Sequence, residues 1–393
     1  MKFDFDHVID RSGGDSFKWN RYIGRDVLPL WVADMDFAAP PAIVDALQAR
    51  VTQGVFGYGD VPSQLNATVV AHLARDYAWS VEPSWLVWLP GLVSGLNIAC
   101  RAVGAPGDAV FTATPIYPPF LSAPLHAQRR LRSAPLHLEQ DAGASVATQR
   151  WSWDLAATQA ALADDTRLFL LCHPHNPVGR AWHDEELQAI AALAERHDLV
   201  VCSDEIHCGL MLEPGRRHRP FATLGKEASR RSITLMAPSK TFNIPGLGAA
   251  FAVIPDAALR QRFRAAAAGI VPHVNLLGLV AAQAAYASCA DWQQALLAYL
   301  RDNRACVAAA VAALPALALA PVEATYLAWI DARRLAGRVG KVQAHFEAAG
   351  VGLADGEDFG GEAYRGFVRL NFGCPRATLV RALARIAAAA GGA

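Results

Sequence analysis

The chain has 393 residues, which is too long for one simple core and predicts two domains. Basic and acidic residues both number 36, so the formal net charge is zero. The sequence therefore lacks the excess of positive charge that is typical of proteins that bind nucleic acid or an acidic membrane surface. Seven scattered cysteines without a C-x-x-C pair argue against a disulfide framework or a metal site, and favour reduced thiols in a cytoplasm. The opening MKFDFDHVIDR lacks the apolar stretch of a signal peptide, and no run of about 18 uncharged apolar residues predicts a membrane span.

The first 30 residues are polar and irregular, and they carry a basic and aromatic tip, SFKWNRYIG (16–24). We expect residues 1–45 to form an N-terminal arm and part of a smaller domain. Residues 46–284 are expected to form a larger, ligand-binding domain.

Six short apolar runs follow within the larger domain, and segments of helical pattern separate them. They are WLVWL (85–89), AVFT (109–112), LFLLC (168–172), LVVCS (199–203), ITLMA (233–237) and AAFAV (249–253). Such runs are typical of strands buried on both faces, so the sequence predicts an α/β fold with a mostly parallel sheet flanked by helices. Between them, residues 184–198 predict an amphipathic helix that Asp184 can cap.

From about residue 285 the chain is rich in alanine and helical in pattern. It then gives two strand-like stretches, EATYLAWID (323–331) and GFVRLNFG (366–373). Residues 285–393 therefore predict a C-terminal, smaller α+β domain.

Five of the apolar runs end in a loop with polar or glycine residues. These loops contain PGLVSG (90–95), ATPIYPP (113–119), HPHNPVG (173–179), DEIH (204–207) and PSKTFN (238–243). The carboxyl ends of the strands in an open α/β sheet form its ligand crevice, so the five loops are expected to converge there.

The loops differ in the chemistry that they offer. Residues 90–95 follow a strand and open a helical segment, whose N–H groups can bind phosphate, although an ordinary turn would look the same. Tyr117 can stack on a flat ring or only pack, and Asn176 offers a neutral amide. Asp204 ends a buried strand and needs a partner, such as a pyridinium N–H, unless it starts a solvated helix. His207 is near enough to join it.

Lys240 is the sharpest signal, because the chain contains only five lysines against 31 arginines. A neutral amine attacks a carbonyl, and lysine can be deprotonated in a protein whereas arginine cannot. An anion cradle, a stacking surface, an acid for a ring nitrogen and this lysine together predict pyridoxal 5′-phosphate (PLP). A nicotinamide site would need G-x-G-x-x-G after the first strand, and a P-loop would need G-K-[ST]; the sequence has neither.

These residues resemble those of fold-type I PLP enzymes, the aminotransferase class I/II superfamily. Within it, the chain resembles the MalY/PatB-like cystathionine β-lyase (cysteine-S-conjugate β-lyase) branch nearly from end to end. The stretches that carry the resemblance are IDRSGGDSFKWN, LPLWVADMDF (28–37), GVFGY (54–58), HNPVGR (175–180), SDEIH (203–207), PSKTFN (238–243) and GFVRLNFGCPR (366–376). The resemblance implies a seven-stranded sheet and a homodimer with shared active sites.

The resemblance also implies a role for each site residue. Lys240 would bind the cofactor covalently and act in catalysis, and Arg369 would bind the substrate α-carboxylate. Cofactor contacts would come from Gly91, Leu92, Val93 and Ser239, from Tyr117 on the ring, from Asp204 at the ring nitrogen, and from Asn176 and His207 near the ring oxygen. Tyr58 would reach the phosphate in the neighbouring subunit. One position departs from the wider superfamily, because Gly248 stands where many members have a phosphate-binding arginine.

The implied activity is the α,β-elimination of L-cystathionine or a related cysteine S-conjugate to a thiol, pyruvate and ammonia. An aminotransferase would use the same groups, and a regulatory protein that binds PLP is a further alternative. No nucleic-acid or membrane partner is expected.

Overall fold

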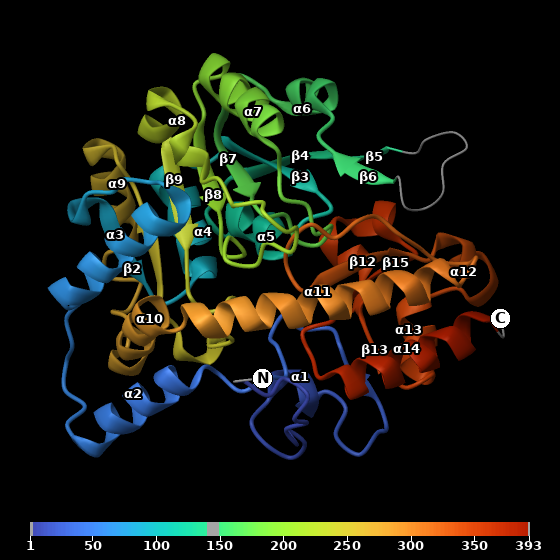
Figure 1. The fold of residues 1–393 in the computed structure, drawn as a ribbon. Helices are drawn as coiled ribbons and strands as arrows, with labels where there is room; N and C mark the ends of the chain where they lie inside the picture. Colours follow the sequence, from blue (N-terminus) through green and yellow to red (C-terminus); the bar gives the residue numbers. More distant parts are fainter. Residues whose placement is uncertain (1–2, 140–148, 392–393) are drawn as a thin grey trace.

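A computed structural model describes residues 3–139 and 149–391 of the chain. Its centre is a seven-stranded sheet with the order β2-β10-β9-β8-β7-β3-β4 (Figure 1). The strands are β2 (Leu86–Leu89), β3 (Ala109–Thr114), β4 (Arg130–Pro135), β7 (Thr166–Cys172), β8 (Val200–Asp204), β9 (Ser232–Met236) and β10 (Ala250–Val253). All pairings are parallel except those of β10, which runs antiparallel to both β2 and β9.

Each of the six apolar runs forms a strand of this sheet, so the predicted fold class is confirmed. The strand that the sequence did not predict is β4, which lies at the edge and pairs only with β3. Arg130 and Arg132 lie in β4 and are not buried, since an edge strand needs no continuous apolar run.

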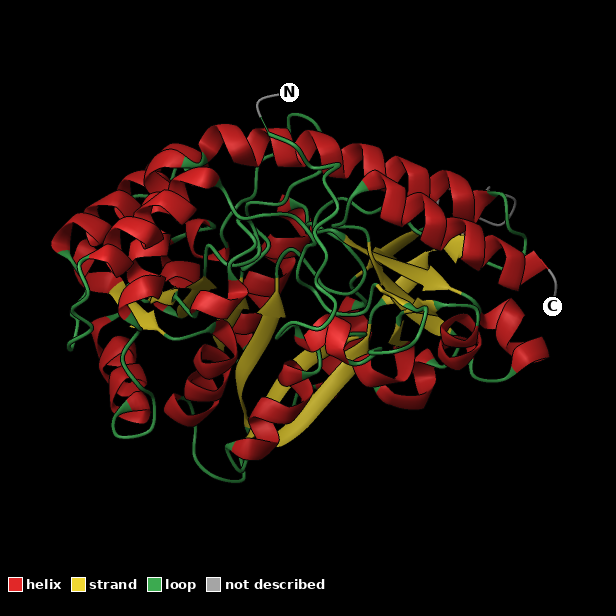
Figure 2. Cartoon of the chain, turned by 90° about the horizontal axis from the view of Figure 1, so that it is seen from below, coloured by secondary structure: helices red, strands yellow, loops and turns green. Residues whose placement is uncertain are grey.

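Helices cover both faces of the sheet (Figures 1 and 2). One face packs against α4 (Leu92–Ala102), α5 (Pro119–His126) and α9 (Ala257–Ala267). The other packs against α6 (Leu155–Ala161) and α7 (Asp184–Arg196), and α8 (Lys226–Arg230) lies beside them. Leu168 and Leu170 of β7 are buried toward the first set, while Phe169 and Leu171 are buried toward the second. Alternate residues of one strand therefore serve two cores, which explains the continuous apolar run.

The predicted helix at 184–198 is confirmed as α7, but the prediction that Asp184 caps it is wrong. His183 is the N-cap, and its backbone N–H donates to the Glu186 carboxylate at 2.8 Å. Asp184 lies in the first turn and forms an ion pair with Arg219 instead.

A second sheet lies beside the first and has the order β11-β12-β15-β14. It comprises β11 (Ala318–Leu319), β12 (Leu327–Asp331), β14 (Ala354–Asp355) and β15 (Phe367–Asn371), so both strand-like stretches of the tail are confirmed as β12 and β15. The helices near it are α12 (Arg333–Val339), α13 (Val342–Ala348) and α14 (Arg376–Gly391). The 23-residue α11 (Ala290–Ala312) runs from α10 (Leu276–Ser288) to this sheet (Figure 1).

The N-terminal segment is not a free arm, because β1 (Leu28–Pro29) pairs in parallel with β13 (Val351–Gly352). It also contains α1 (Phe17–Asn20), and α2 (Pro41–Thr52) and α3 (Ser63–Tyr77) connect it to the large sheet. A two-stranded ribbon, β5 (His137–Glu139) and β6 (Arg150–Ser152), lies next to the unplaced segment.

The domain boundaries at 45/46 and 284/285 stay a prediction; the second falls inside α10, and residues 1, 2, 392 and 393 lie outside the described residues. Over the part of the chain that is described, no helix is both long and apolar enough to cross a membrane.

Candidate active site

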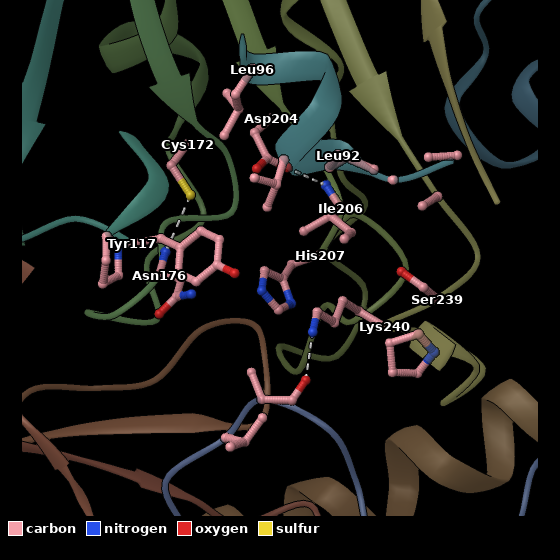
Figure 3. Close-up of a pocket in the computed structure, with 18 of the residues that line it drawn as sticks. Leu92, Leu96, Tyr117, Cys172, Asn176, Asp204, Ile206, His207, Ser239 and Lys240 are labelled. Carbon is pink, nitrogen blue, oxygen red and sulfur yellow. Dashed lines mark hydrogen bonds between the residues drawn. The ribbon is translucent and has the colours of Figure 1, made fainter. Parts of the chain in front are cut away.

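A cavity of about 420 Å³ lies at the carboxyl ends of the central strands, between the two sheets. Ten of the eleven predicted site residues line it, and they come from five loops of the large sheet and from β15. They are Gly91, Leu92, Val93, Tyr117, Asn176, Asp204, His207, Ser239, Lys240 and Arg369. Seven of them are labelled in Figure 3. The structure therefore brings together residues that are up to 278 positions apart in the sequence (369 − 91 = 278).

Lys240 lies just after β9 and projects into this cavity. Its Nζ donates to the backbone oxygen of Ala33 at 2.6 Å, the bond dashed below Lys240 in Figure 3. Burial lowers the pKa of Lys240 to about 8; Asp34 and Asp204 oppose the shift, and Arg369 adds to it. About a tenth of the amine is thus neutral at pH 7, far more than for an ordinary lysine. The neutral amine is the form that acts as a nucleophile or base.

Residues 31–37 include Ala33, whose backbone oxygen accepts the hydrogen bond from Lys240. Side-chain amides fix the backbone of this segment. Asn371 donates to the backbone oxygens of Val32 and Asp34 at 2.6 and 2.7 Å. Asn243 donates to the oxygens of Met35 and Phe37 at 2.9 and 2.8 Å, and it accepts from the Met35 N–H at 2.9 Å.

Tyr326 adds a second donor to the oxygen that Lys240 uses. Its hydroxyl lies 2.8 Å from the Ala33 oxygen. Asn243, Asn371 and Tyr326 were not predicted, although the first two lie within the stretches PSKTFN and GFVRLNFG.

Asp204 ends β8 and is 4% exposed. Its Oδ1 accepts one hydrogen bond, from the Ile206 N–H at 3.1 Å. Burial raises the pKa of Asp204 to about 7, against the lowering effects of that bond and of Lys240. A cationic N–H donor in the cavity would favour the ionised carboxylate and lower this pKa.

His207 is buried close to Lys240 and is neutral at neutral pH. Burial lowers the pKa of His207 to about 3, with smaller contributions from the charges of Lys240 and Arg369. Within the described residues its Nδ1 is buried without a hydrogen-bond partner. The ring meets Tyr326 edge-on, with centroids 6.1 Å apart.

Arg369 reaches the cavity from β15 of the second sheet. One terminal nitrogen donates to Asn176 Oδ1 at 3.0 Å, and the other donates to the Trp31 backbone oxygen at 2.8 Å. Its guanidinium lies 4.8 Å from the centre of the Phe359 ring, and its Nε is buried without a partner among the described residues. Burial lowers the pKa of Arg369 to about 10, so the side chain stays cationic near neutral pH.

The bond from Arg369 also orients Asn176. Because Asn176 Oδ1 accepts from Arg369, its Nδ2 remains a donor toward the cavity. An acceptor oxygen on a bound ring is the matching partner. Tyr117 lines the same cavity from the loop before α5, and burial raises the pKa of its hydroxyl.

The predicted anion cradle is the amino end of α4. Gly91 is the N-cap and offers no side-chain cap, so the N–H groups of Leu92 and Val93 in the first turn have no acceptor within the helix. Ser239 lines the same cavity. An N-terminus of an 11-residue helix beside a hydroxyl is a suitable site for a phosphate.

The structure explains why glycine stands at position 248. Gly248 has φ +58°, and a Cβ built there would lie 3.0 Å from the backbone oxygen of Pro90. An arginine at this position would combine an unfavourable backbone conformation with a close contact. The wider superfamily's phosphate arginine therefore has no equivalent side chain here.

Tyr58 is the one predicted site residue outside the cavity. It is fully exposed and lies near the exposed Val55 and Phe56. Its predicted role in a neighbouring subunit stays a prediction, as do the cofactor contacts assigned to the other residues.

No group of three or more His, Cys, Asp or Glu side chains that could hold a metal ion occurs among the described residues. A lysine of lowered pKa, a buried acid, a neutral amide donor and a helix end together match the functional groups of PLP.

Comparison with known proteins places this site in a family. The model for aminotransferase class I and II matches residues 25–386. "Cystathionine beta-lyase PatB" of Bacillus subtilis is 35% identical over 98% of this chain and 99% of its own length. The crystal structure titled OvoB superposes with a TM-score of 0.94 at 48% identity, covering 100% of both chains. Cystalysin from Treponema denticola, whose title states a pyridoxal 5′-phosphate cofactor, gives a TM-score of 0.93 at 30% identity over 100% of both chains. The protein belongs to the aminotransferase class I and II family.

Proposed function

We propose that this protein is a PLP-dependent carbon–sulfur β-lyase, which converts L-cystathionine or a related cysteine S-conjugate, together with water, to a thiol, pyruvate and ammonia. The observation that carries the proposal is the meeting of Lys240, Asp204 and Arg369 in one cavity, with the pKa of Lys240 at about 8. The full-length similarity to a cystathionine β-lyase supports a lyase over other activities of the family.

The cavity offers one contact for each polar part of PLP. The amino end of α4 and Ser239 would hold the phosphate, and Asn176 Nδ2 would donate to the ring oxygen. Tyr117 would pack against the ring. When bound, PLP would supply an aldehyde carbon that links to amines and an electron-poor ring that accepts an electron pair from the substrate Cα.

Asp204 would hold the proton at the ring nitrogen. Its carboxyl group has a pKa of about 7 because it is buried, and within the described part of the chain it accepts a single hydrogen bond, from a backbone N–H. A cationic N–H beside it replaces the lost hydration, so the carboxylate and the ring proton stabilise each other.

Lys240 would move the Cα proton. Its Nζ is fixed by the Ala33 oxygen, and its lowered pKa lets the amine both accept and return a proton near neutral pH. Neutral His207 nearby adds no positive charge that would lower the pKa of Lys240 further.

Arg369 would bind the α-carboxylate of the substrate. Its two terminal nitrogens already bond to Asn176 and to the Trp31 oxygen, which fixes the plane of the guanidinium. The unpartnered Nε gives it a remaining donor for a carboxylate.

Product formation separates a lyase from an aminotransferase. The holoenzyme with cystathionine or S-methylcysteine should release pyruvate continuously with no keto acid added. Turnover that begins only after a keto acid is supplied would show that the protein is an aminotransferase.

We also infer a homodimer in which Tyr58 completes the site of the neighbouring subunit. Its support is the position of Tyr58, which is fully exposed beside Phe56, itself 60% exposed. Lys240→Ala and Tyr58→Ala homodimers should each have low activity. Subunit exchange should restore about a quarter of the wild-type activity, since half of the dimers are hybrids with one intact site. No recovery after confirmed exchange would show that each site is built from a single subunit.

A further inference from the structure

One charged residue of the cavity has no part in the function proposed above. Four charged side chains line the cavity: Asp204, Lys240, Arg369 and Asp358. The first three have roles in binding the cofactor or the amino-acid part of the substrate. Asp358 comes from a different segment, the 3₁₀ turn at Gly356–Phe359.

This turn is fixed next to Arg369. Asp355 caps it by accepting from the Glu357 N–H at 3.3 Å, and the Phe359 oxygen accepts from the Ile116 N–H at 2.8 Å. The Phe359 ring packs on the guanidinium of Arg369. The position of Asp358 is therefore set relative to the residue that would bind the α-carboxylate.

The three acids of this segment differ in how they are partnered. Asp355 forms an ion pair with Lys341 at 2.8 Å, and Glu357 lies 3.9 Å from Arg365. Asp358 makes no hydrogen bond or ion pair with any described residue, although its carboxyl group lies within the electrostatic influence of Lys341, Arg21 and Arg369.

Arg21, one of the cations that act on Asp358, has other contacts. Its guanidinium lies 4.7 Å from the centre of the Trp31 ring, and one nitrogen is 4.0 Å from Glu347. Asp358 thus lines the cavity without a direct hydrogen-bond or ion-pair partner among the described residues.

Two aromatic rings form the wall of the same cavity. Phe17 and Trp31 both line it, with ring centroids 5.2 Å apart, and Phe17 is 75% exposed. Trp31 is held by a hydrogen bond from its Nε1 to the Lys18 oxygen at 3.1 Å. Aromatic faces stabilise both an alkyl chain and an adjacent cation.

We propose that Asp358, Phe17 and Trp31 form a subsite for a positively charged S-substituent, so that the favoured substrates are cysteine S-conjugates with an ammonium group beyond the sulfur. The proposal rests on the lyase function proposed above. Arg369 would hold the α-carboxylate, and a side chain extending from it along the fixed turn would pass the aromatic rings and place its ammonium group beside Asp358.

Three conjugates of similar size test the charge preference. They are S-(2-aminoethyl)-L-cysteine, S-propyl-L-cysteine and S-carboxymethyl-L-cysteine, which end in a cation, a methyl group and an anion. We expect kcat/KM for pyruvate release to be highest for the aminoethyl conjugate, about fivefold to tenfold above the propyl conjugate, and lowest for the carboxymethyl conjugate. Equal values for the aminoethyl and propyl conjugates would overturn the proposal.

Matched variants assign the preference to Asp358. Asp358→Asn should reduce the aminoethyl-to-propyl ratio to about one, since only the charged substituent loses a partner. Glu357→Gln removes a neighbouring charge on the same turn and should keep the wild-type ratio. Phe17→Ala should lower kcat/KM for both conjugates. An aminoethyl preference that survives in Asp358→Asn would place the subsite elsewhere.

The same three conjugates separate this proposal from the reaction type. Each can be titrated into the holoenzyme and its binding followed by the visible absorbance of the cofactor. Tighter binding of the aminoethyl conjugate that depends on Asp358, without pyruvate release, would support the subsite and overturn the lyase. Pyruvate release from all three conjugates at equal rates would support the lyase and overturn the subsite.

Discussion

Two regions of this protein bury charge in opposite ways. In the first, Arg180 is 1% exposed and is surrounded by partners. Its terminal nitrogens donate to Glu323 at 2.6 and 2.8 Å and to Glu186 at 2.5 Å, and its Nε donates to the Trp151 oxygen at 2.7 Å. Arg216 adds a further bond to Glu323 at 3.0 Å. The charges of this network satisfy one another.

The second region is the cavity, where charged groups are only partly satisfied. Asp204 has one backbone donor, Lys240 has one backbone acceptor, and Arg369 has a buried Nε without a partner among the described residues. Single unpartnered atoms also occur elsewhere, for example at Trp329 Nε1. The cavity differs because its incompletely hydrogen-bonded groups are charged and lie beside a space that is large enough for a ligand.

This difference teaches that burial of charge is not by itself a sign of function. The Arg180 network joins HNPVGR to the segment before β12 and stabilises the fold, whereas the cavity retains bonding capacity for a cofactor and a substrate. Substitutions in the two regions should therefore change different measured quantities.

The largest effect is expected from Lys240→Arg. The variant keeps a positive charge but cannot link to the cofactor or carry the Cα proton, so turnover should fall by at least about 10³-fold. Borohydride reduction followed by peptide mass spectrometry should locate the cofactor on Lys240 in the wild type and nowhere in the variant. Lys226→Arg, at an exposed position on α8, is the control and should behave as the wild type. Cofactor attached at another lysine in the wild type would contradict the assignment.

Asp204→Asn should leave the cofactor bound and lower kcat by about 10³-fold, because a neutral side chain no longer stabilises the proton at the ring nitrogen. Cofactor content from absorbance and kcat from pyruvate release measure the two parts separately. The exposed Asp45→Asn is a matched control on α2. Near-normal turnover in Asp204→Asn would show that the charge of Asp204 is not needed for catalysis.

Arg369→Lys should weaken the binding of every amino-acid substrate by about 2–4 kcal/mol, since a point charge replaces a planar fork. The measurement is kcat/KM for a series of S-conjugates. A loss confined to one conjugate would mean that Arg369 contacts the S-substituent rather than the α-carboxylate.

Glu323→Gln tests the other region. Loss of its charge leaves Arg180 buried beside one fewer carboxylate, and the free energy of unfolding should fall by about 3 kcal/mol. Chemical denaturation measures this, and kcat of the folded variant should stay close to that of the wild type. Glu185→Gln, exposed on α7, should change stability by less than about 0.5 kcal/mol. Unchanged stability in Glu323→Gln would mean that the network does not stabilise the fold.

A gradual effect is expected in the pH dependence of stability in cofactor-free protein. The pKa of Asp204 is about 7 in the folded state and near 3.8 in the unfolded state, so the folded state binds more protons between these values. Stability should therefore fall as the pH rises from about 4 to 7, with Asp204 contributing up to about 1.4 kcal/mol per pH unit. The Asp204→Asn variant should show a correspondingly shallower decline in denaturation experiments. Parallel pH profiles would show that the cavity does not raise the pKa of Asp204.

The sequence predicts best where burial is uniform. Strands such as β7 are covered on both faces, so their apolar runs are visible in the sequence, whereas β4 at the edge is mostly not buried and was missed. The loops that follow the buried strands converge because parallel strands end at one edge of the sheet, and this brought Asp204 and Lys240 into the prediction.

Long-range contacts are harder to predict. Arg369 comes from another sheet, and only the family resemblance pointed to it. Asn243, Asn371 and Tyr326 act on the backbone of residues 31–37, and a contact with a distant backbone oxygen leaves no pattern in either segment. Asp358 belongs to an acidic stretch whose three carboxylates look alike until their ion pairs are known.

The Ala33 oxygen accepts from both Lys240 and Tyr326, and it lies in the same short segment as Trp31, which lines the cavity. One stretch of peptide therefore supplies both part of the cavity wall and the acceptor for the Lys240 amine. Exchanging residues 31–37 for those of a relative, in order to change substrate preference, should also move the pH optimum of the enzyme's activity. We therefore expect substrate preference and the pKa of Lys240 to change together when this segment is changed.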